Sequence, residues 1–282
     1  MIIFKKARDI TRFLAEQKGS ASPVGFVPTM GALHQGHISL ILTSKKTDGL
    51  TLCSIFVNPT QFNNKKDFEK YPSSIERDIY MLEETGCDVL FLPGIPEMYP
   101  GGIKNDGHFD LGYLETILEG KFRPGHYQGV CQVVNRLLAI IQPGRLYLGQ
   151  KDYQQCMVLK KMIGLTQQET EIIICPTIRE KDGLAMSSRN ILLNEKERKQ
   201  AVKIAETLAF IKKELKTGYL EDLKERATGY LNAEGFKVDY VEIANAKTLE
   251  PVEYNYGKMP LVALVAAFVN DVRLIDNMIL DT

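Results

Sequence analysis

Short apolar runs rich in β-branched residues alternate with helical patterns through the first 177 residues, and this alternation restricts the fold more than any other feature. Five runs end in turn-prone or polar residues and are interpreted as buried strands: residues 24–28, 50–58, 87–93, 145–149 and 171–176. Helical patterns, such as residues 74–86 and 129–144, separate them. The alternation predicts an α/β domain, residues 1–177, in which helices cover a parallel sheet. Ligands bind such sheets beyond the carboxyl ends of the strands.

The pattern changes after Arg179. Asn194 followed by Glu197 is a capping box, and the apolar residues of 194–215 then recur on one helical face. A second helix over roughly 219–234 is followed by apolar segments at 236–245, 261–269 and 272–280, the last two flanking Asn270 and Asp271 like a hairpin. Two helices followed by strands predict a smaller α+β domain, residues 178–282. The polar segment 177–190 contains a glycine, and we expect the boundary and a hinge there.

Composition restricts the function of this chain of 282 residues, which is long enough for two domains. No run approaches the roughly 20 apolar residues that cross a bilayer, which argues against a membrane role. The 35 basic and 35 acidic residues cancel, so an anion must be bound at a local site. The N-terminus lacks the features of a secretory signal, which predicts a cytoplasmic protein. Five cysteines without a C-x-x-C pair predict buried thiols rather than zinc or disulfide chemistry.

The stretch FVPTMGALHQGH, residues 26–37, holds two of the four histidines, His34 and His37, directly after a predicted strand. If the next helix begins near His34, both imidazoles and the free N–H groups of its first turn form an anion site. A metal site would need a third ligand, and H-x-x-H alone is weak support. A dinucleotide loop would need a second glycine within GALHQG. A pair of surface histidines is the remaining interpretation, and the strand–turn–helix context favours the anion site over it.

TMGALHQGH resembles the HIGH-type motif of the nucleotidyltransferase superfamily that includes class I aminoacyl-tRNA synthetases, and MSSRN (186–190) resembles its KMSKS-type partner. The segments SIFVNPTQF, RPGHYQGV, YLGQKDYQQ and REKDGLAMSSRN narrow the resemblance to the pantothenate synthetase family. The resemblance implies a Rossmann-like first domain and a second domain that acts as a lid. It also implies ATP-dependent condensation of pantoate with β-alanine through a pantoyl adenylate. Further implications are Mg²⁺, a homodimer, and small-molecule partners without nucleic acid or membrane.

The resemblance also implies roles for particular residues. His34, His37 and Lys151 are the implied catalytic residues. ATP would be bound by four groups: Met30, Gly31, Ala32, Leu33, His34, Gln35, Gly36 and His37; Gly149, Gln150, Lys151 and Asp152; Ile178; and Met186, Ser187, Ser188 and Arg189. Gln61, Gln155 and Asn58 would bind pantoate, with Gln61 also binding β-alanine, and Asp88 would help to place magnesium.

Each of these roles has a plainer alternative. Lys151 is then a solvated surface lysine, Asp152 caps the next helix, and residues 187–189 form a linker that caps a helix. Asn58 marks only a turn, and Asp88 is structural. Arg123 and His126 either shape the pantoate side or cap a helix, and neither is predicted to be catalytic.

Two other functions compete with the ligase. One is an adenylyl- or cytidylyltransferase of the same fold without the amine-consuming step. The other is an RNA-binding module descended from synthetases, which requires a basic strip that the balanced charge opposes.

Overall fold

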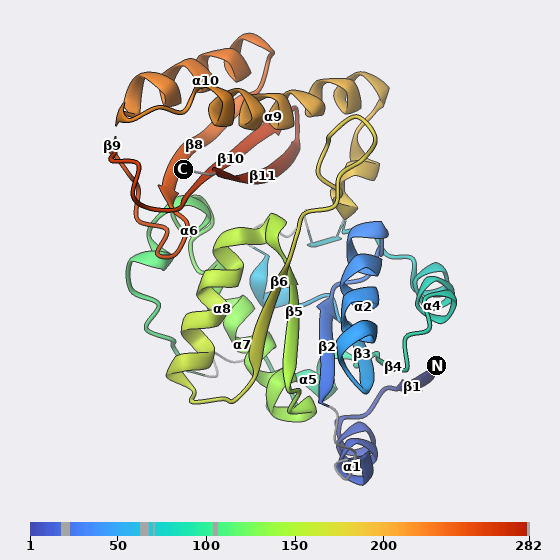
Figure 1. Cartoon of the computed structure of the whole chain (residues 1–282). Helices are drawn as coiled ribbons and strands as arrows, with labels where there is room; N and C mark the ends of the chain where they lie inside the picture. Colours follow the sequence, from blue (N-terminus) through green and yellow to red (C-terminus); the bar gives the residue numbers. More distant parts are fainter. Residues whose placement is uncertain (18–22, 63–67, 70, 104–106, 281–282) are drawn as a thin grey trace. The chain divides into compact units, whose positions relative to one another are not determined.

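The computed structural model describes residues 1–17, 23–62, 68–69, 71–103 and 107–280 (Figure 1). The chain forms two compact units. The first comprises Met1–Gly149 and Val158–Pro176, and the second comprises Gln150–Met157 and Thr177–Thr282. A short segment that follows a strand of the first unit therefore belongs to the second. The division of tasks between a nucleotide-binding domain and a lid stays a prediction.

The first unit contains a six-stranded sheet in the order β1-β4-β3-β2-β5-β6, in which every neighbouring pair is parallel. The strands are β1 Ile2–Phe4, β2 Val24–Thr29, β3 Leu50–Ile55, β4 Val89–Phe91, β5 Arg145–Gly149 and β6 Glu171–Cys175. The five predicted strands are confirmed. The edge strand β1 was not predicted, because three residues followed by two lysines give too short a pattern to recognise.

Helices pack on both faces of this sheet (Figure 1). The helices of this part of the chain are α1 Ala7–Gln17, α2 Gln35–Thr47, α4 Ile75–Glu84, α5 Ile95–Met98, α6 Leu118–Phe122, α7 His126–Ile141 and α8 Tyr153–Leu165. Short 3₁₀ turns are η1 Pro59–Gln61, η2 Gly112–Glu115 and η3 Gln150–Asp152. Helix α2 contacts β2, β3, β5 and β6, whereas α1 contacts α7. The predicted helices over 74–86 and 129–144 are confirmed as α4 and α7.

The strand order reverses between β2 and β5, which pair through Gly25 with Arg145 and Phe26 with Leu146. The chain leaves β2 for β3 on one side and leaves β5 for β6 on the other. In α/β sheets, ligands commonly bind beyond the carboxyl ends of the strands near such a reversal. The loop after β2 begins at Met30, the first of the residues implied to bind ATP.

The second unit is a smaller α+β assembly. Its strands β8 Lys237–Asn245, β10 Leu261–Val269 and β11 Val272–Leu280 form an antiparallel sheet in the order β11-β10-β8. The other elements are η4 Ser188–Leu192, α9 Glu195–Glu214, α10 Glu221–Ala233, β7 Gly218–Tyr219 and β9 Tyr254–Asn255. The hairpin turns at Asn270, whose φ of 49° is left-handed. The α+β prediction is confirmed.

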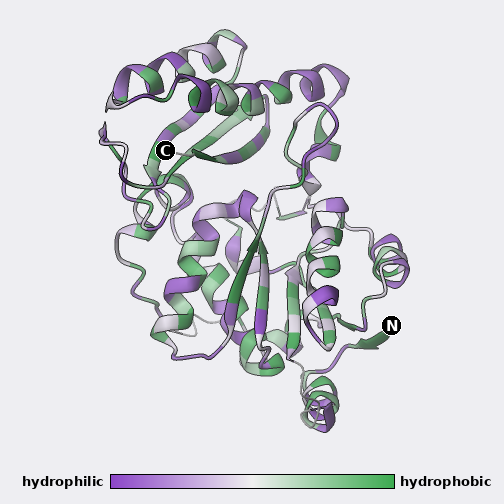
Figure 2. Ribbon diagram, in the orientation of Figure 1, coloured by the Kyte–Doolittle hydropathy of each residue, from purple (hydrophilic) through white to green (hydrophobic). Residues whose placement is uncertain are grey.

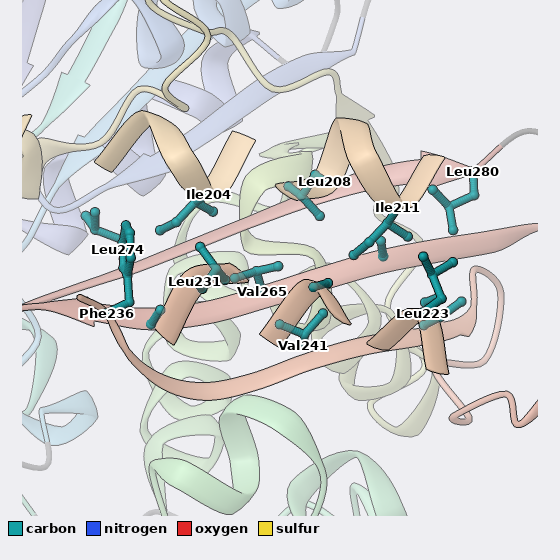
Figure 3. Close-up of a cluster of buried hydrophobic side chains, with 14 of the residues drawn as sticks. Ile204, Leu208, Ile211, Leu223, Leu231, Phe236, Val241, Val265, Leu274 and Leu280 are labelled. Carbon is teal, nitrogen blue, oxygen red and sulfur yellow. The ribbon is translucent and has the colours of Figure 1, made fainter. Parts of the chain in front are cut away.

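Apolar side chains of α9 and α10 form the core of the second unit against its sheet. Ile204, Leu208 and Ile211 project from α9 toward strand residues such as Val265 (Figure 3). Figure 2 shows mainly hydrophobic residues along β10 and many hydrophilic residues on α9 and α10. All of β10 except one residue is buried, which explains its uninterrupted apolar sequence.

The five cysteines are buried and free, as predicted. Burial raises the pKa of Cys87 to about 11 and that of Cys131 to about 12, so both remain thiols at neutral pH.

The described part of the chain contains no helix with the length and apolarity needed to span a bilayer.

Candidate active site

The turn after β2 sets the two histidines at the start of α2. Gly31 and Ala32 have left-handed φ values of 83° and 50°, which turn the chain sharply. His34 is the N-cap, and its Nδ1 accepts a hydrogen bond from the Gly36 backbone N–H at 3.1 Å. His37 Nδ1 accepts from the His34 backbone N–H at 3.3 Å. The predicted start of the helix near His34 is confirmed, and both histidines form a reciprocal capping box.

The capping box determines the tautomer of both imidazoles. Because each Nδ1 accepts a backbone N–H, it carries no proton, and a neutral ring then holds its proton on Nε2. The rings lie 4.1 Å apart between centroids. In the neutral form, His34 and His37 therefore each carry a donor on Nε2, at the N-terminus of α2. Negatively charged oxygen atoms are the ligands that suit this arrangement.

Asp78 of α4 holds the turn that precedes His34, and the sequence analysis missed it. Its side chain is 0% exposed. Oδ2 accepts from the Ala32 N–H and Oδ1 from the Leu33 N–H, both at 2.8 Å. A Cβ on Gly31 would lie 3.0 Å from Oδ2, so the turn needs glycine there. The sequence does contain one signal: Asp78 lies four residues before buried Leu82, on the face of α4 that should be apolar.

The turn after β3 brings Asn58, Gln61 and Met30 together. Asn58 is 1% exposed and caps η1, since its Oδ1 accepts from the Thr60 N–H at 3.3 Å. Its Nδ2 donates to Gln61 Oε1 at 3.2 Å, and Gln61 Nε2 lies 2.9 Å from Met30 Sδ. Asn58 is thus a turn residue, as its plainer alternative held, and also orients the side chain of Gln61.

Helix α7 supports the main chain of Gln61. His126 Nδ1 donates to the Gln61 carbonyl at 2.8 Å, and its Nε2 then accepts from Arg123 at 3.1 Å. A Cβ on Gly129 would lie 2.5 Å from the Thr60 carbonyl oxygen, so only glycine allows this close approach. Arg123 and His126 therefore position the turn that carries Gln61.

The segment after β5 belongs to the second unit. Gly149 ends β5, and Lys151 lies in η3 with its Nζ 3.7 Å from Asp152 Oδ1. The Lys151 side chain is 18% exposed, so it is not an ordinary solvated lysine. Gln155 is half-buried in the first turn of α8. The phosphate and pantoate roles of Lys151 and Gln155 stay predictions.

The segment before α9 brings other implied ATP residues together. The Met186 N–H donates to the Ile178 carbonyl at 3.0 Å, and Arg179 pairs with Ala185 as an antiparallel bridge. Ser187 Oγ then accepts from the Arg189 N–H at 3.3 Å and caps η4. The capping alternative for this segment is therefore what the structure shows, and phosphate binding by residues 187–189 stays a prediction.

Asp88 lies at the wrong edge of the sheet for a ligand of phosphate-bound magnesium. It precedes β4, accepts from the Thr51 N–H at 2.8 Å and pairs with Lys45 at 3.3 Å. These contacts are at the amino end of the parallel strands, whereas the turn with His34 follows the carboxyl end of β2. The structural alternative for Asp88 is favoured. Within the described ranges, no three His, Cys, Asp or Glu side chains gather as a metal site.

The fold and the β2–α2 turn together define a class: α/β enzymes with a second α+β unit, in which ligands commonly bind at the carboxyl edge of the parallel sheet. The family model for pantoate–β-alanine ligase matches residues 2–279. This chain belongs to the pantoate–β-alanine ligase family.

Known pantothenate synthetases match this chain over nearly its full length, in sequence and in structure. The pantothenate synthetase of Cytophaga hutchinsonii is 44% identical and that of Acetivibrio thermocellus 43%, with at least 99% of each chain covered. The crystal structure of the pantothenate synthetase from Thermus thermophilus matches with a TM-score of 0.90 at 36% identity, covering 100% of both chains. The Francisella tularensis pantoate–β-alanine ligase, complexed with β-γ ATP and β-alanine, matches with a TM-score of 0.81 at 38% identity, covering 100% of this chain and 98% of that one.

Proposed function

We propose that this chain condenses (R)-pantoate with β-alanine at the expense of ATP and releases pantothenate, AMP and pyrophosphate. Family membership supports the overall reaction, and the Francisella relative was crystallised with β-γ ATP and β-alanine. The observation that supports the site assignment is the capping box of His34 and His37 at the start of α2, which follows the strand reversal and leaves Nε2 as the nitrogen that carries the proton in each neutral ring.

The first step forms pantoyl adenylate. A pantoate carboxylate oxygen attacks the α-phosphorus of ATP, and the bond to the bridging oxygen breaks as pyrophosphate leaves. Negative charge grows on the departing oxygens, and the Nε2–H groups of His34 and His37 hydrogen-bond to it there. Lys151 adds a compact positive charge. The residues proposed to bind the nucleotide are those implied by the family resemblance: Met30–His37, Gly149–Asp152, Ile178 and Met186–Arg189.

The second step transfers the acyl group. The β-alanine amine attacks the pantoyl carbonyl carbon, the bond to the AMP oxygen breaks, and the amine loses a proton. Neither step needs a covalent enzyme nucleophile, so alignment of the reactants is the main task of the protein. Asn58 holds Gln61 ready to bind pantoate and β-alanine through its neutral amide, and Gln155 binds pantoate.

The side chains fit magnesium only indirectly. Asp88 is at the other edge of the sheet, and the described residues hold no cluster of metal ligands. Mg²⁺ would therefore be bound mainly by ATP oxygens and water, as is usual for this ion. Removing divalent ions with EDTA should abolish turnover, and added Mg²⁺ should restore it without changing the melting temperature of the free protein. A large loss of thermal stability with EDTA would instead indicate a structural metal.

The test of the reaction is amine dependence. Purified protein with ATP, pantoate and Mg²⁺ should release AMP stoichiometrically only when β-alanine is present, and mass spectrometry should find pantothenate. Pantoate should also support exchange of labelled pyrophosphate into ATP without β-alanine. Rapid pyrophosphate release that ignores β-alanine, with the AMP group retained on an adenylated product, would favour a transferase of the same fold. We also propose a cytoplasmic homodimer, which light scattering of the purified protein tests.

A further inference from the structure

Two consecutive polar residues near the end of β11 are buried, which is unusual for a strand. Asp276 is 4% exposed and Asn277 is 2% exposed. Neighbouring residues of a strand point to opposite faces, so a single buried face does not explain both. Buried polar groups need hydrogen-bond partners, and apart from the Asn277 N–H, which donates to Asp276 Oδ1, the partners of these two side chains lie far away in the sequence.

Asn277 fixes both peptide groups that flank Lys151. Its Nδ2 donates to the Gln150 carbonyl and to the Lys151 carbonyl, each at 2.9 Å. Its Oδ1 accepts from Gln150 Nε2 at 3.1 Å. Holding the carbonyls before and after one α-carbon fixes the backbone dihedral angles of Lys151, and hence the direction in which its side chain leaves the main chain.

Asp276 fixes the segment that begins at Ile178 and contains Arg179. Its Oδ2 accepts from Arg179 Nη1 at 2.6 Å and its Oδ1 from Arg179 Nη2 at 3.0 Å. The same guanidinium donates to the Gly183 carbonyl at 3.0 Å. Arg179 follows Ile178 directly and pairs with Ala185, which precedes residues 186–189. The bidentate ion pair with Asp276 therefore attaches the start of this segment to β11.

We propose that Asp276 and Asn277 are a positioning pair for the ligase reaction: Asn277 fixes the position of Lys151, and Asp276 fixes the position of segment 178–189. This proposal rests on the proposed function. The pair acts through Lys151 and Arg179, and one strand thereby aligns two segments that are separated by 26 residues of intervening chain, 152–177. Misplacing a catalytic group by about 1 Å costs on the order of 100-fold in rate.

Asn277→Asp tests the first half of the pair. The substitution keeps the shape of the side chain but replaces both N–H donors with an oxygen that repels the two carbonyls. We expect kcat to fall about 100-fold, with faster hydrogen exchange of the amides in segment 150–152. Asn277→Ser, which keeps one donor and adds no charge, should give a folded protein with a kcat loss of about tenfold.

Asn255→Asp is the matched control. Asn255 is 3% exposed in the same unit, donates through Nδ2 to the Lys216 carbonyl at 3.1 Å and accepts from the Gly257 N–H at 2.8 Å. It should lower the melting temperature about as much as Asn277→Asp while leaving kcat within about twofold of wild type. Equal kcat values for Asn277→Asp, Asn277→Ser and wild type would overturn the proposal.

Arg179→Lys tests the second half. Lysine keeps the charge but cannot form the bidentate pair with Asp276. We expect KM for ATP to rise about tenfold with a smaller change in kcat. Arg273→Lys is the control, since Arg273 of β11 also pairs with a carboxylate, that of Asp239 in β8, at 2.8 Å, and its kinetics should stay near wild type. Identical KM values in both variants would contradict the role of Asp276.

The hydrogen-exchange experiment separates the positioning proposal from the proposed function. If wild type made no pantothenate, the proposed function would fail. Loss of protection in segment 150–152 of Asn277→Asp would still show that Asn277 holds Lys151. If wild type were active and the exchange unchanged, only the positioning proposal would fail.

Discussion

Helices α2 and α9 begin with the same reciprocal capping geometry but with different chemistry. In α9, Asn194 and Glu197 accept each other's backbone N–H groups at 2.9 Å, and both are favoured cap residues. In α2, His34 and His37 occupy the equivalent positions, and His37 Nδ1 accepts from the His34 N–H over a longer 3.3 Å, while His34 Nδ1 also accepts from the Gly36 N–H at 3.1 Å. Histidine is not a preferred N-cap. The cap of α9 serves the helix, whereas the cap of α2 also presents a second ring nitrogen as a donor.

The two helix starts also differ in the contacts that support them. Buried Asp78 accepts hydrogen bonds from two backbone N–H groups of the turn before α2. The α9 cap is exposed, and the pKa of Glu197 is lowered by its hydrogen bond from the Asn194 backbone. A buried acceptor with two short bonds fixes the orientation of the turn. We therefore expect substitutions at α2 to change catalysis and substitutions at α9 to change only stability.

The largest expected effect comes from His37→Ala. Loss of its Nε2–H donor should lower kcat by about 1,000-fold, because the contact strengthens as charge develops. The free energy of unfolding should fall by only about 1 kcal/mol, the usual cost of a lost cap. Steady-state kinetics and urea unfolding measure the two quantities.

Glu197→Ala is the control for this experiment, since it removes the equivalent residue from α9 and should leave kcat unchanged. If His37→Ala retained near-wild-type turnover, the contrast between the two caps would disappear and the site assignment would be wrong.

Asp78→Asn should have the next largest effect. An amide cannot accept both N–H bonds of the turn, so one buried donor loses its partner at a cost of about 1–3 kcal/mol. We also expect kcat/KM for ATP to fall about tenfold as the start of α2 loses its orientation.

Asp48→Asn is a matched control for stability. The side chain of Asp48 is also buried, and it accepts from Arg145 at 2.9 Å at the amino edge of the sheet. It should destabilise the fold without the kinetic loss. A kinetic loss of the same size in Asp48→Asn would show that Asp78 acts through general stability alone.

Gly129→Ala extends the comparison to the Gln61 turn. The added methyl would meet the Thr60 carbonyl at 2.5 Å and must push the turn away. Overpacking of this kind costs about 1–3 kcal/mol. We expect KM for pantoate to rise about fivefold while KM for ATP stays near wild type. Gly164→Ala is the control because no atom lies within 4 Å of a Cβ there.

Local patterns predicted the elements well. Periodicity located five of the six parallel strands, and the Asn194 and Glu197 pair located the start of α9, because each signal lies within a few residues. The strand reversal is not a local signal, since it depends on which strands pair. The sequence still predicted where the site should lie, because loops at carboxyl strand ends are the common binding position in such sheets.

The supporting residues were harder to predict because their partners are distant. Asp78 contacts Leu33 across 45 residues and Asn277 contacts Lys151 across 126. The magnesium role implied for Asp88 stays a prediction, and the structure shows only its structural contacts. Its position at the start of a strand is visible in the sequence, but a strand start lies at the amino edge, away from the ligand loops. The tautomers of His34 and His37 required hydrogen-bond geometry that no sequence pattern contains.

The smallest expected effect tests whether the α9 cap is purely structural. The folded-state pKa of Glu197 is lowered, so its carboxylate stabilises the fold above the unfolded pKa of about 4.3 and loses that contribution as the pH falls. Wild type should therefore be more stable than Glu197→Ala at pH 7, and the difference should shrink as the pH is lowered toward about 3. Urea unfolding across this range measures it. A difference that grew on acidification would show that the charge of Glu197 opposes folding, and the α9 cap would then no longer be the purely stabilising counterpart of the histidine cap of α2.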